Sequence, residues 1–157
     1  MNIVINASPL IFLYKIDRLD VLNKIFDTVY IPQAVLREIE SGNIVESKEI
    51  LSNITHKSLT VTNLTAVHGM LGRLHIGEVE VIVSAIENGI TNVVLDDMYA
   101  RNKAKQLKLK VTGTLGILVR AREIGLIENI GKDIEGLINA GMYLSDKLIE
   151  RIIYNRL

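Results

Sequence analysis

The sequence predicts an α/β protein whose parallel strands are covered by helices on both faces. Short segments rich in β-branched residues alternate with longer segments of helical spacing along the whole chain. Several of the helical segments stop at a glycine, as at Gly42, Gly89 and Gly125. Parallel strands need a crossover between them, usually a helix, so this alternation favours a parallel sheet over hairpins.

The first half of the chain begins with a strand at Ile3–Ile5, where three β-branched residues favour an extended backbone. Ser8 can then cap a helix that has Pro9 at its first position, and the helical pattern runs from residue 8 to residue 25. The segments expected next are a strand at Thr28–Ile31, a helix at Pro32–Ser41, a polar helix at Val45–Leu51, an alternating strand at Ser58–Leu64 and an irregular connection at His68–His75.

The second half repeats the alternation. It opens with a clearly amphipathic helix whose apolar stripe contains Val79, Ile82, Val83 and Ile86. The expected elements are this helix at Gly77–Asn88, a strand at Asn92–Leu95, a basic helix at Met98–Leu107, a short strand at Lys110–Thr114, and helices at Thr114–Ile124, Lys132–Ala140 and Asp146–Arg156.

Composition narrows the class of protein. The chain has 157 residues, is 48% hydrophobic and has a mean hydropathy of +0.28, so we expect one folded domain, residues 1–157, rather than a disordered chain. No apolar run approaches the ~18 residues of a membrane helix, and the amino terminus does not resemble a signal peptide. The absence of cysteine excludes disulfides and thiolate metal sites and fits a cytoplasmic protein. Because the net charge is zero, binding to a nucleic acid would depend on a local basic patch.

Polar residues follow two of the expected strands. Asn6 comes directly after Ile3–Ile5, and Asp96 comes directly after Asn92–Leu95. In α/β proteins, ligands bind at the carboxyl ends of such strands. Asp97 is the better candidate for capping the next helix, which leaves Asp96 without a structural explanation.

Two of the expected helices carry further acids. Glu38 follows Ala34 by four residues and Val35 by three, so it projects from the apolar stripe of its helix. A carboxylate there is costly unless it is paired or binds a cation; the alternative is a side chain that reaches solvent from the edge of the stripe. Glu78 flanks the stripe of its own helix, and its structural alternative is an acid that interacts with the helix dipole.

Other polar residues receive a structural interpretation. Glu80 shares a face with Ser84 and Glu87, and we expect Glu80 to be solvated. The histidines lack the spacing of metal ligands on a common helix, and we expect loop or surface positions for His56, His68 and His75.

Four oxygen-bearing residues, from two strand ends and two helices, form a constellation that could converge on one cleft. They are Asn6, Glu38, Glu78 and Asp96. Ligation by oxygen alone suits Mg²⁺ or Mn²⁺, whose usual work is phosphate chemistry.

At these residues the chain resembles the PIN-domain family, small metal-dependent ribonucleases that include the VapC toxins of prokaryotic toxin–antitoxin pairs. It is most similar to a branch whose opening has an acid or Asn, a small residue and then Ser-Pro-Leu-Ile. The resemblance covers nearly the whole chain and rests on the order and spacing of "INASPLI", "YIPQAVLREI", "GEVEVIVSAIENG", "VVLDD", "VTGTLGIL" and "AGMYLSDKLIE". It implies a three-layer α/β/α fold with a central parallel sheet of about five strands.

The resemblance also implies a site in which a cluster of acids holds one or two divalent cations, Mg²⁺ or Mn²⁺. The catalytic and metal-binding positions of the family fall on Asn6, Glu38, Glu78 and Asp96. Ser8 matches a hydroxyl residue two beyond the first acid, and we expect it to bond a ligand as well as to cap. The chain departs from the common pattern twice, since Asn6 is neutral where most of the family has Asp and Glu78 is longer than the usual Asp.

A basic segment follows Asp96 directly. "RNKAKQLKLK", residues 101–110, contains five basic residues and no acid. We expect Arg101 and Lys103 to contact RNA phosphates beside Asp97, and Lys105 to extend the track; the alternative is an ordinary solvated helix. Thr114 is expected to be a helix N-cap near the same rim rather than a ligand.

These observations favour a Mg²⁺- or Mn²⁺-dependent endoribonuclease that acts as the toxin of a toxin–antitoxin pair. Its expected partners are RNA, a small antitoxin protein and a second copy of the chain. The competing hypothesis is a regulatory PIN-like module that binds RNA or protein and whose catalysis is weakened or lost. The last helix carries a stripe that either packs on the domain or binds a partner, formed by Leu148, Ile149, Ile152 and Ile153.

Overall fold

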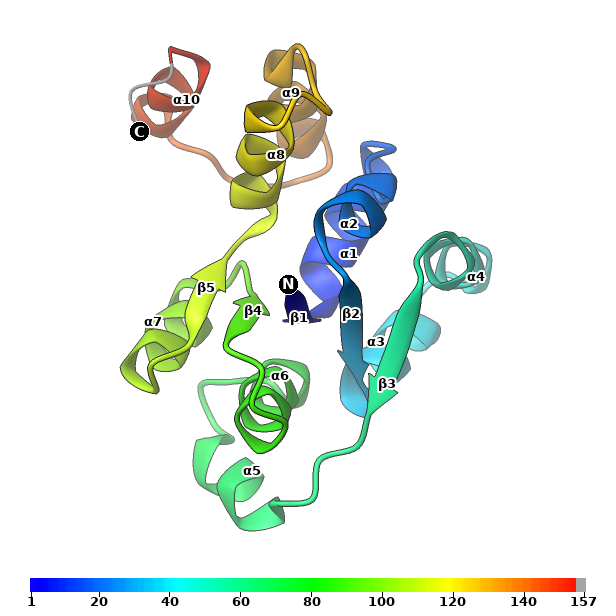
Figure 1. The fold of residues 1–157 in the computed structure, drawn as a ribbon, viewed down its shortest axis with the longest axis vertical. Helices are drawn as coiled ribbons and strands as arrows, with labels where there is room; N and C mark the ends of the chain where they lie inside the picture. The colour runs from blue at the N-terminus through cyan, green and yellow to red at the C-terminus, as the bar shows by residue number, and fades with distance from the viewer. Residues whose placement is uncertain (155–157) are drawn as a thin grey trace.

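The computed structural model of the chain describes residues 1–154, and within them five strands form one parallel sheet. The strands are β1 (Asn2–Ile5), β2 (Thr28–Pro32), β3 (His56–Leu59), β4 (Asn92–Val94) and β5 (Lys110–Thr112). Their order across the sheet is β3-β2-β1-β4-β5 (Figure 1), and every neighbouring pair is parallel. The α/β class and the parallel sheet of about five strands are thus confirmed.

β1 is the central strand, and its residues Ile3, Val4 and Ile5 are at most 1% exposed. A parallel strand that is covered on both faces needs such a continuous apolar run. The chain leaves β1 toward β2 on one side and later returns to its other side with β4, so the strand order reverses between β1 and β4. This reversal is the topological switch point, where α/β sheets characteristically bind their ligands.

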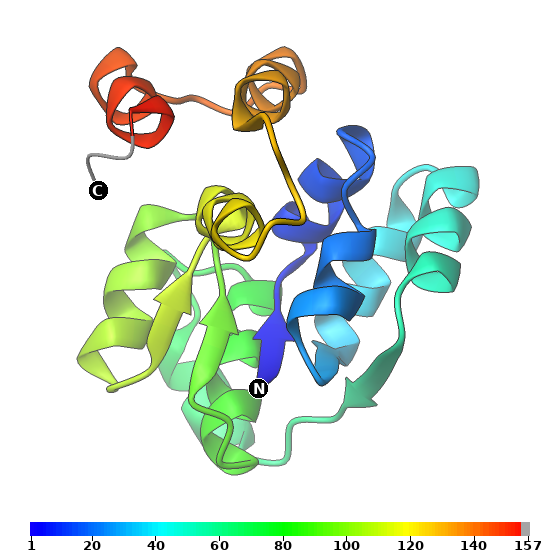
Figure 2. The same ribbon diagram turned by 45° about the horizontal axis from the view of Figure 1, so that its top comes forward.

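Helices cover both faces of the sheet, which makes the architecture a three-layer α/β/α fold. The helices are α1 (Ala7–Lys15), α2 (Asp20–Ile25), α3 (Gln33–Ser41), α4 (Ile44–Asn53), α5 (Leu64–Met70), α6 (Ile76–Glu87), α7 (Met98–Gln106), α8 (Thr114–Glu123), α9 (Ile130–Asn139) and α10 (Asp146–Ile153). α6 packs against β1, β2 and β4 and against α3, whereas α8 contacts α1, α2 and β5. Figure 2 shows α9 and α10 as an outer pair beyond α8.

The structure differs from the sequence predictions in the connections. The helical pattern over residues 8–25 is two helices, because Asp17 adopts a positive φ of 56° and the chain turns there. The strand expected at Ser58–Leu64 begins earlier and ends at Leu59. Of the irregular connection expected at His68–His75, the residues up to Met70 instead belong to α5, which Asn63 caps by accepting a hydrogen bond from the Ala66 N–H; residues 71–75 are not helical, as expected. The expected end of the last helix, Arg156, lies outside the described residues.

α6 is covered more completely than its amphipathic pattern predicts. Ser84, which lies on the same helix face as Glu80, is fully buried, whereas Ile86 of the predicted apolar stripe is 48% exposed. α6 contacts the sheet, α3, α5 and α7, so little of its surface remains for water. Nowhere in residues 1–154 is there a helix with both the length and the apolarity needed to cross a membrane.

Candidate functional site at the carboxyl ends of β1 and β4

Asn6 lies at the switch point, one residue after β1. Its backbone N–H donates to the Val94 carbonyl at 3.1 Å, which continues the β1–β4 ladder by one residue. Its side chain is buried, and the Oδ1 atom has no hydrogen-bond partner. A buried acceptor without a donor costs about 1–3 kcal/mol. An amide oxygen in this condition is suited to accept a cation or the water that accompanies one.

Glu38 approaches Asn6 from α3. A Cβ atom added at Gly77 would lie 2.9 Å from Glu38 Oε2 and 3.2 Å from Asn6 Oδ1. The missing side chain at Gly77, in the first turn of α6, therefore leaves room for both oxygens. Ala34, Val35 and Ile39 of α3 are buried as predicted, while Glu38 is exposed at the edge of that stripe. The structure thus brings together one carboxylate and one unpartnered amide oxygen.

Glu78 is buried and takes part in the start of its own helix. Its Oε2 accepts a hydrogen bond from the His75 backbone N–H at 3.0 Å, in a capping box. Burial raises the pKa of Glu78, the His75 hydrogen bond opposes this, and the nearby charges of Asp97 and Glu38 raise it further. The structural alternative for Glu78 therefore accounts for one of its oxygens, while its charge remains close to the other acids.

Asp96 is held in place by three hydrogen bonds. Its Oδ1 accepts from the Thr114 backbone N–H at 2.7 Å, and its Oδ2 accepts from the Thr114 hydroxyl at 2.7 Å and from Ser8 Oγ at 3.2 Å. The prediction that Ser8 and Thr114 are the N-caps of their helices is wrong. The N-caps are Asn6 for α1 and Gly113 for α8. α1 begins at Ala7, one residue before Ser8, and α8 begins at Thr114 itself, so these two hydroxyls orient the Asp96 carboxylate instead of capping their helices.

α7 begins beside Asp96 and carries the basic residues. Asp97 accepts from the Ala100 N–H at 2.9 Å, so its predicted capping role is confirmed. Arg101 turns back toward the sheet, and its Nη1 donates to the Leu95 carbonyl at 2.9 Å. Lys103 is half-buried and Lys105 is exposed on the same helix.

The prediction that Glu80 is solvated is wrong. Its side chain is only 13% exposed, it accepts from the Ala34 N–H at 2.7 Å, and it lies 3.9 Å from Arg37. α3 begins after Pro32, which offers no side-chain cap, and a carboxylate from the neighbouring helix supplies the acceptor instead. Helical periodicity carries no signal for such a contact, because the acceptor and the helix it caps are far apart in the sequence.

Of the three histidines, His75 contacts a residue of the site, through the hydrogen bond from its backbone N–H to Glu78. His56 is half-buried in β3, whereas His68 and His75 are exposed, as expected of surface residues. Sequence reasoning overlooked Gly77 and Gly113, each of which leaves space for side chains of the site. The sequence signal that could have identified them is their position, since Gly77 directly precedes the candidate acid Glu78 and Gly113 directly precedes the hydroxyl residue Thr114.

The donor set fits one hard cation better than a closed cage. Among residues 1–154, no three Asp, Glu or His side chains lie where they could hold a metal ion together. Mg²⁺ commonly binds through one or two carboxylates and keeps several of its waters. Glu38 and the unpartnered Asn6 Oδ1 match this mode of binding, with Asp96 and Glu78 as neighbouring charges.

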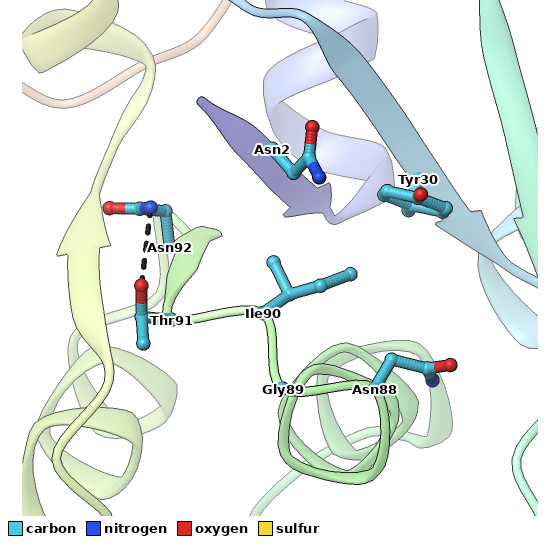
Figure 3. A pocket seen from close by; sticks show the side chains of 7 residues that line it. All are labelled: Asn2, Tyr30, Asn88, Gly89, Ile90, Thr91 and Asn92. Atoms are coloured by element: carbon cyan, nitrogen blue, oxygen red, sulfur yellow. Dashed lines mark hydrogen bonds between the residues drawn. The ribbon is translucent and has the colours of Figure 1, made fainter.

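A hollow at the opposite edge of the sheet has a different character. It has a volume of about 340 Å³ and lies among the amino ends of β1 and β4, Tyr30 and the α6–β4 turn (Figure 3). Asn92 Nδ2 donates to Thr91 Oγ1 at 3.4 Å at its rim. Its lining residues are all uncharged. They are Asn2, Tyr30, Asn88, Gly89, Ile90, Thr91 and Asn92. The candidate acids and Arg101 lie at the opposite, carboxyl end of the strands, away from this hollow.

A parallel α/β sheet with carboxylates and an arginine at its switch point belongs to the class of α/β proteins that bind their ligands at the carboxyl ends of the strands. The chain belongs to the PIN-domain family DUF3368, whose family model matches residues 2–155. The predicted resemblance is thus confirmed. The PIN domain is a nuclease fold whose members are typically dependent on divalent metals. Neither the curated proteins nor the solved structures contain a match to this chain.

Proposed function

We propose that this protein is an endoribonuclease of the cytoplasm that requires Mg²⁺ or Mn²⁺ and hydrolyses RNA phosphodiesters. The observation that carries the proposal is the buried Asn6 Oδ1, which lacks a hydrogen-bond partner and shares the space over Gly77 with Glu38. Both lie at the switch point of a PIN-domain sheet. Glu38 and Asn6 would hold the ion, with Glu78 and Asp96 as neighbouring charges that act through its bound waters.

Bound there, a divalent ion supplies an activated water and stabilises the charge that develops on the phosphodiester. The residues of the chain prepare the site for this chemistry. Ser8 and Thr114 fix the Asp96 carboxylate, and the resulting orientation does not depend on the ion. Glu78, as part of the α6 cap, keeps the first turn of α6 beside Glu38.

The RNA would approach along α7. Arg101 lies beside Asp96, and Lys103 and Lys105 follow on the same helix. Basic side chains that contact phosphates contribute affinity without reading the base sequence. Because the net charge of the protein is zero, this local track is the support for RNA as the substrate.

The role of toxin, with a small antitoxin as partner, rests on the resemblance of the motifs to the VapC branch of the family. A homodimer is part of the same proposal, and exposed apolar side chains near the carboxyl end, such as Tyr143 at 89% and Ile153 at 46%, support an interface there. Co-expression with a small reading frame beside the gene should relieve growth arrest, and light scattering should report two chains per particle. A protein that neither arrests growth nor dimerises would contradict this part of the proposal.

The ribonuclease is tested with a pair of variants on α3. Glu38→Gln removes the carboxylate beside Asn6, and Glu40→Gln makes the same change at an exposed position two residues away. We expect Mn²⁺-dependent cleavage of single-stranded RNA by the parent and by Glu40→Gln, with a loss of about 100-fold or more in Glu38→Gln. Cleavage that survives EDTA, or that is equal in the two variants, would contradict the proposed site.

The neutral residue Asn6 favours a second candidate function, a PIN-like module that binds RNA or protein without cutting. This second function predicts that the parent protein binds RNA equally in Ca²⁺ and in Mn²⁺ and that it does not cleave RNA in Mn²⁺ at any protein concentration. The same assay therefore separates the two functions.

A further inference from the structure

Arg101 places a fixed positive charge at one side of the site. Its Nη1 donates to the carbonyl of Leu95 at 2.9 Å, and Leu95 is the buried residue immediately before Asp96. The side chain reaches back from α7 across the start of its own helix to make this bond. A surface arginine that served only to keep the helix solvated would not be anchored to the backbone of the sheet.

Gly113 provides the space in which Arg101 and Asp96 approach each other. A Cβ atom at this position would lie 2.6 Å from Arg101 Nη1 and 2.9 Å from Asp96 Oδ1. Any larger residue would have to displace the guanidinium or the carboxylate. The carboxylate is held by Thr114, so the guanidinium is the group that would move.

The charges of the site are therefore unequally distributed. Around Asp96, both carboxylate oxygens already accept hydrogen bonds, and a guanidinium lies close by. The space over Gly77 contains the unpartnered Asn6 Oδ1 and a Glu38 carboxylate oxygen. Neither of these two atoms has a described contact with a cationic side chain. A divalent ion is attracted to the second half and repelled by Arg101 from the first.

We infer that Arg101 takes the place of a second metal ion in this site. One divalent cation binds at Asn6 and Glu38, and Arg101 supplies the second positive charge by contacting a non-bridging oxygen of the RNA phosphate. A guanidinium is suited to this role because it keeps its charge and matches phosphate oxygens with paired donors. This inference rests on the proposed ribonuclease and specifies how its site is charged.

The experiment measures metal binding and RNA binding separately, in the parent and in variants of α7. Arg101→Met removes the charge, Arg101→Gln removes the charge but keeps a donor for the Leu95 carbonyl, and Lys105→Met removes one charge from an exposed position of the same helix. Calorimetry with Mn²⁺ alone gives stoichiometry and affinity, and fluorescence anisotropy in Ca²⁺ gives the affinity for single-stranded RNA.

We expect the parent to bind one Mn²⁺ per chain. Both Arg101 variants should bind Mn²⁺ roughly threefold or more tightly, because a repelling charge is lost, and should bind RNA about tenfold more weakly. Lys105→Met should weaken RNA binding less and leave Mn²⁺ affinity unchanged. The opposite signs of the two effects distinguish a charge in the site from a structural role, since misfolding would weaken both.

Gly113→Ala gives an independent variant in which the net charge is kept. Its Cβ should push the guanidinium aside, so we expect the same two shifts as in Arg101→Gln. Two Mn²⁺ ions per parent chain, or Arg101 variants that behave like Lys105→Met, would overturn this inference while leaving the ribonuclease intact. A parent that binds no Mn²⁺ would overturn the inference and the proposed function together.

Discussion

Asn6 is a neutral side chain that shares the space over Gly77 with the Glu38 carboxylate, at the position where we propose a metal ion binds. The backbone around it is ordinary for a strand end, with its N–H bonded to Val94. Its Oδ1 is the buried side-chain atom, among those described, that finds no partner. An amide that only shaped the turn after β1 would be expected to bond the backbone of that turn, as Asn commonly does.

Asn6→Asp should tighten the binding of Mn²⁺ or Mg²⁺ by about tenfold or more and raise the rate of RNA cleavage, since changes beside metal ligands alone shift affinity about 10–100-fold. Without metal, the added carboxylate lies near Glu38, so the variant should melt at a lower temperature in EDTA and recover in Mn²⁺.

Asn2→Asp is a matched control, because it makes the same change at the opposite end of β1. Calorimetry and melting curves with and without Mn²⁺ make the comparison. A folded Asn6→Asp variant whose metal affinity equals that of the control would remove Asn6 from the metal site.

Glu78 makes the stability of the protein depend on pH. Burial raises its pKa above 4.5, so the folded protein retains this proton at a pH where the unfolded chain has released it. The free energy of unfolding should therefore fall as the pH rises above about 4.5. Glu78→Gln keeps an oxygen acceptor for the His75 N–H and removes this loss.

Urea denaturation in EDTA between about pH 4 and pH 8 tests this prediction. The stability of Glu78→Gln relative to the parent should increase with pH and then become constant. A difference that is independent of pH would show that Glu78 has its ordinary pKa.

Among the helices, α6 organises the site because it contributes to it in three ways. Gly77 leaves space for Glu38 and Asn6, Glu78 closes the first turn, and Glu80 caps α3. α6 and α3 pack on each other, so the position of Glu38 depends on a residue of the other helix. The geometry of the carboxylates is thus a property of this helix pair.

Glu80→Ala should therefore affect both stability and activity. It leaves the Ala34 N–H, at the buried start of α3, without its acceptor, which should cost about 0.5–2 kcal/mol in chemical denaturation. The looser start of α3 should also weaken Mn²⁺ binding through Glu38. Glu80→Gln keeps an acceptor and is expected to lie close to the parent in both measurements; equal losses in the two variants would instead assign the effect to the charge near Arg37.

Across the whole molecule, the helices near the carboxyl end are connected to the sheet layers by polar contacts at a distance from the site. Arg18, in the turn between α1 and α2, donates to the buried Asp133 of α9 at 2.7 Å. Arg122 of α8 donates to the Ile152 carbonyl of α10 at 2.7 Å. These contacts position the outer pair of helices without involving Asn6 or Glu38.

Asp133→Asn should destabilise the protein by about 1–3 kcal/mol, because Arg18 loses its ionic partner while remaining partly exposed to water. Glu135→Gln, at an exposed position of the same helix, should change stability little. The affinity for Mn²⁺ should be the same in both variants as in the parent. A loss of metal binding in Asp133→Asn would show that α9 and the site are coupled.

Much of the fold follows from local sequence patterns. The β-branched run at Ile3–Ile5 and the apolar strand before Asp96 identify β1 and β4, and in a parallel sheet this information is enough to place Asn6 and Asp96 at the same edge. The cap at Asp97 was also visible, since a capping residue acts on backbone groups three positions away.

The partners of the site side chains were decided by the tertiary structure alone. Glu80 caps α3 through the Ala34 N–H, 46 residues earlier in the chain, and Asp96 accepts hydrogen bonds from Ser8, 88 residues away, and from Thr114, 18 residues away. Arg101 turns toward Leu95 because Gly113, on another segment, leaves it room. Periodicity determines the face of a helix on which a side chain lies, but the donor that it meets there depends on how the helices pack. The sequence by itself therefore determined which oxygen-bearing residues stand at the strand ends, and packing determined which of them kept an oxygen free for a ligand.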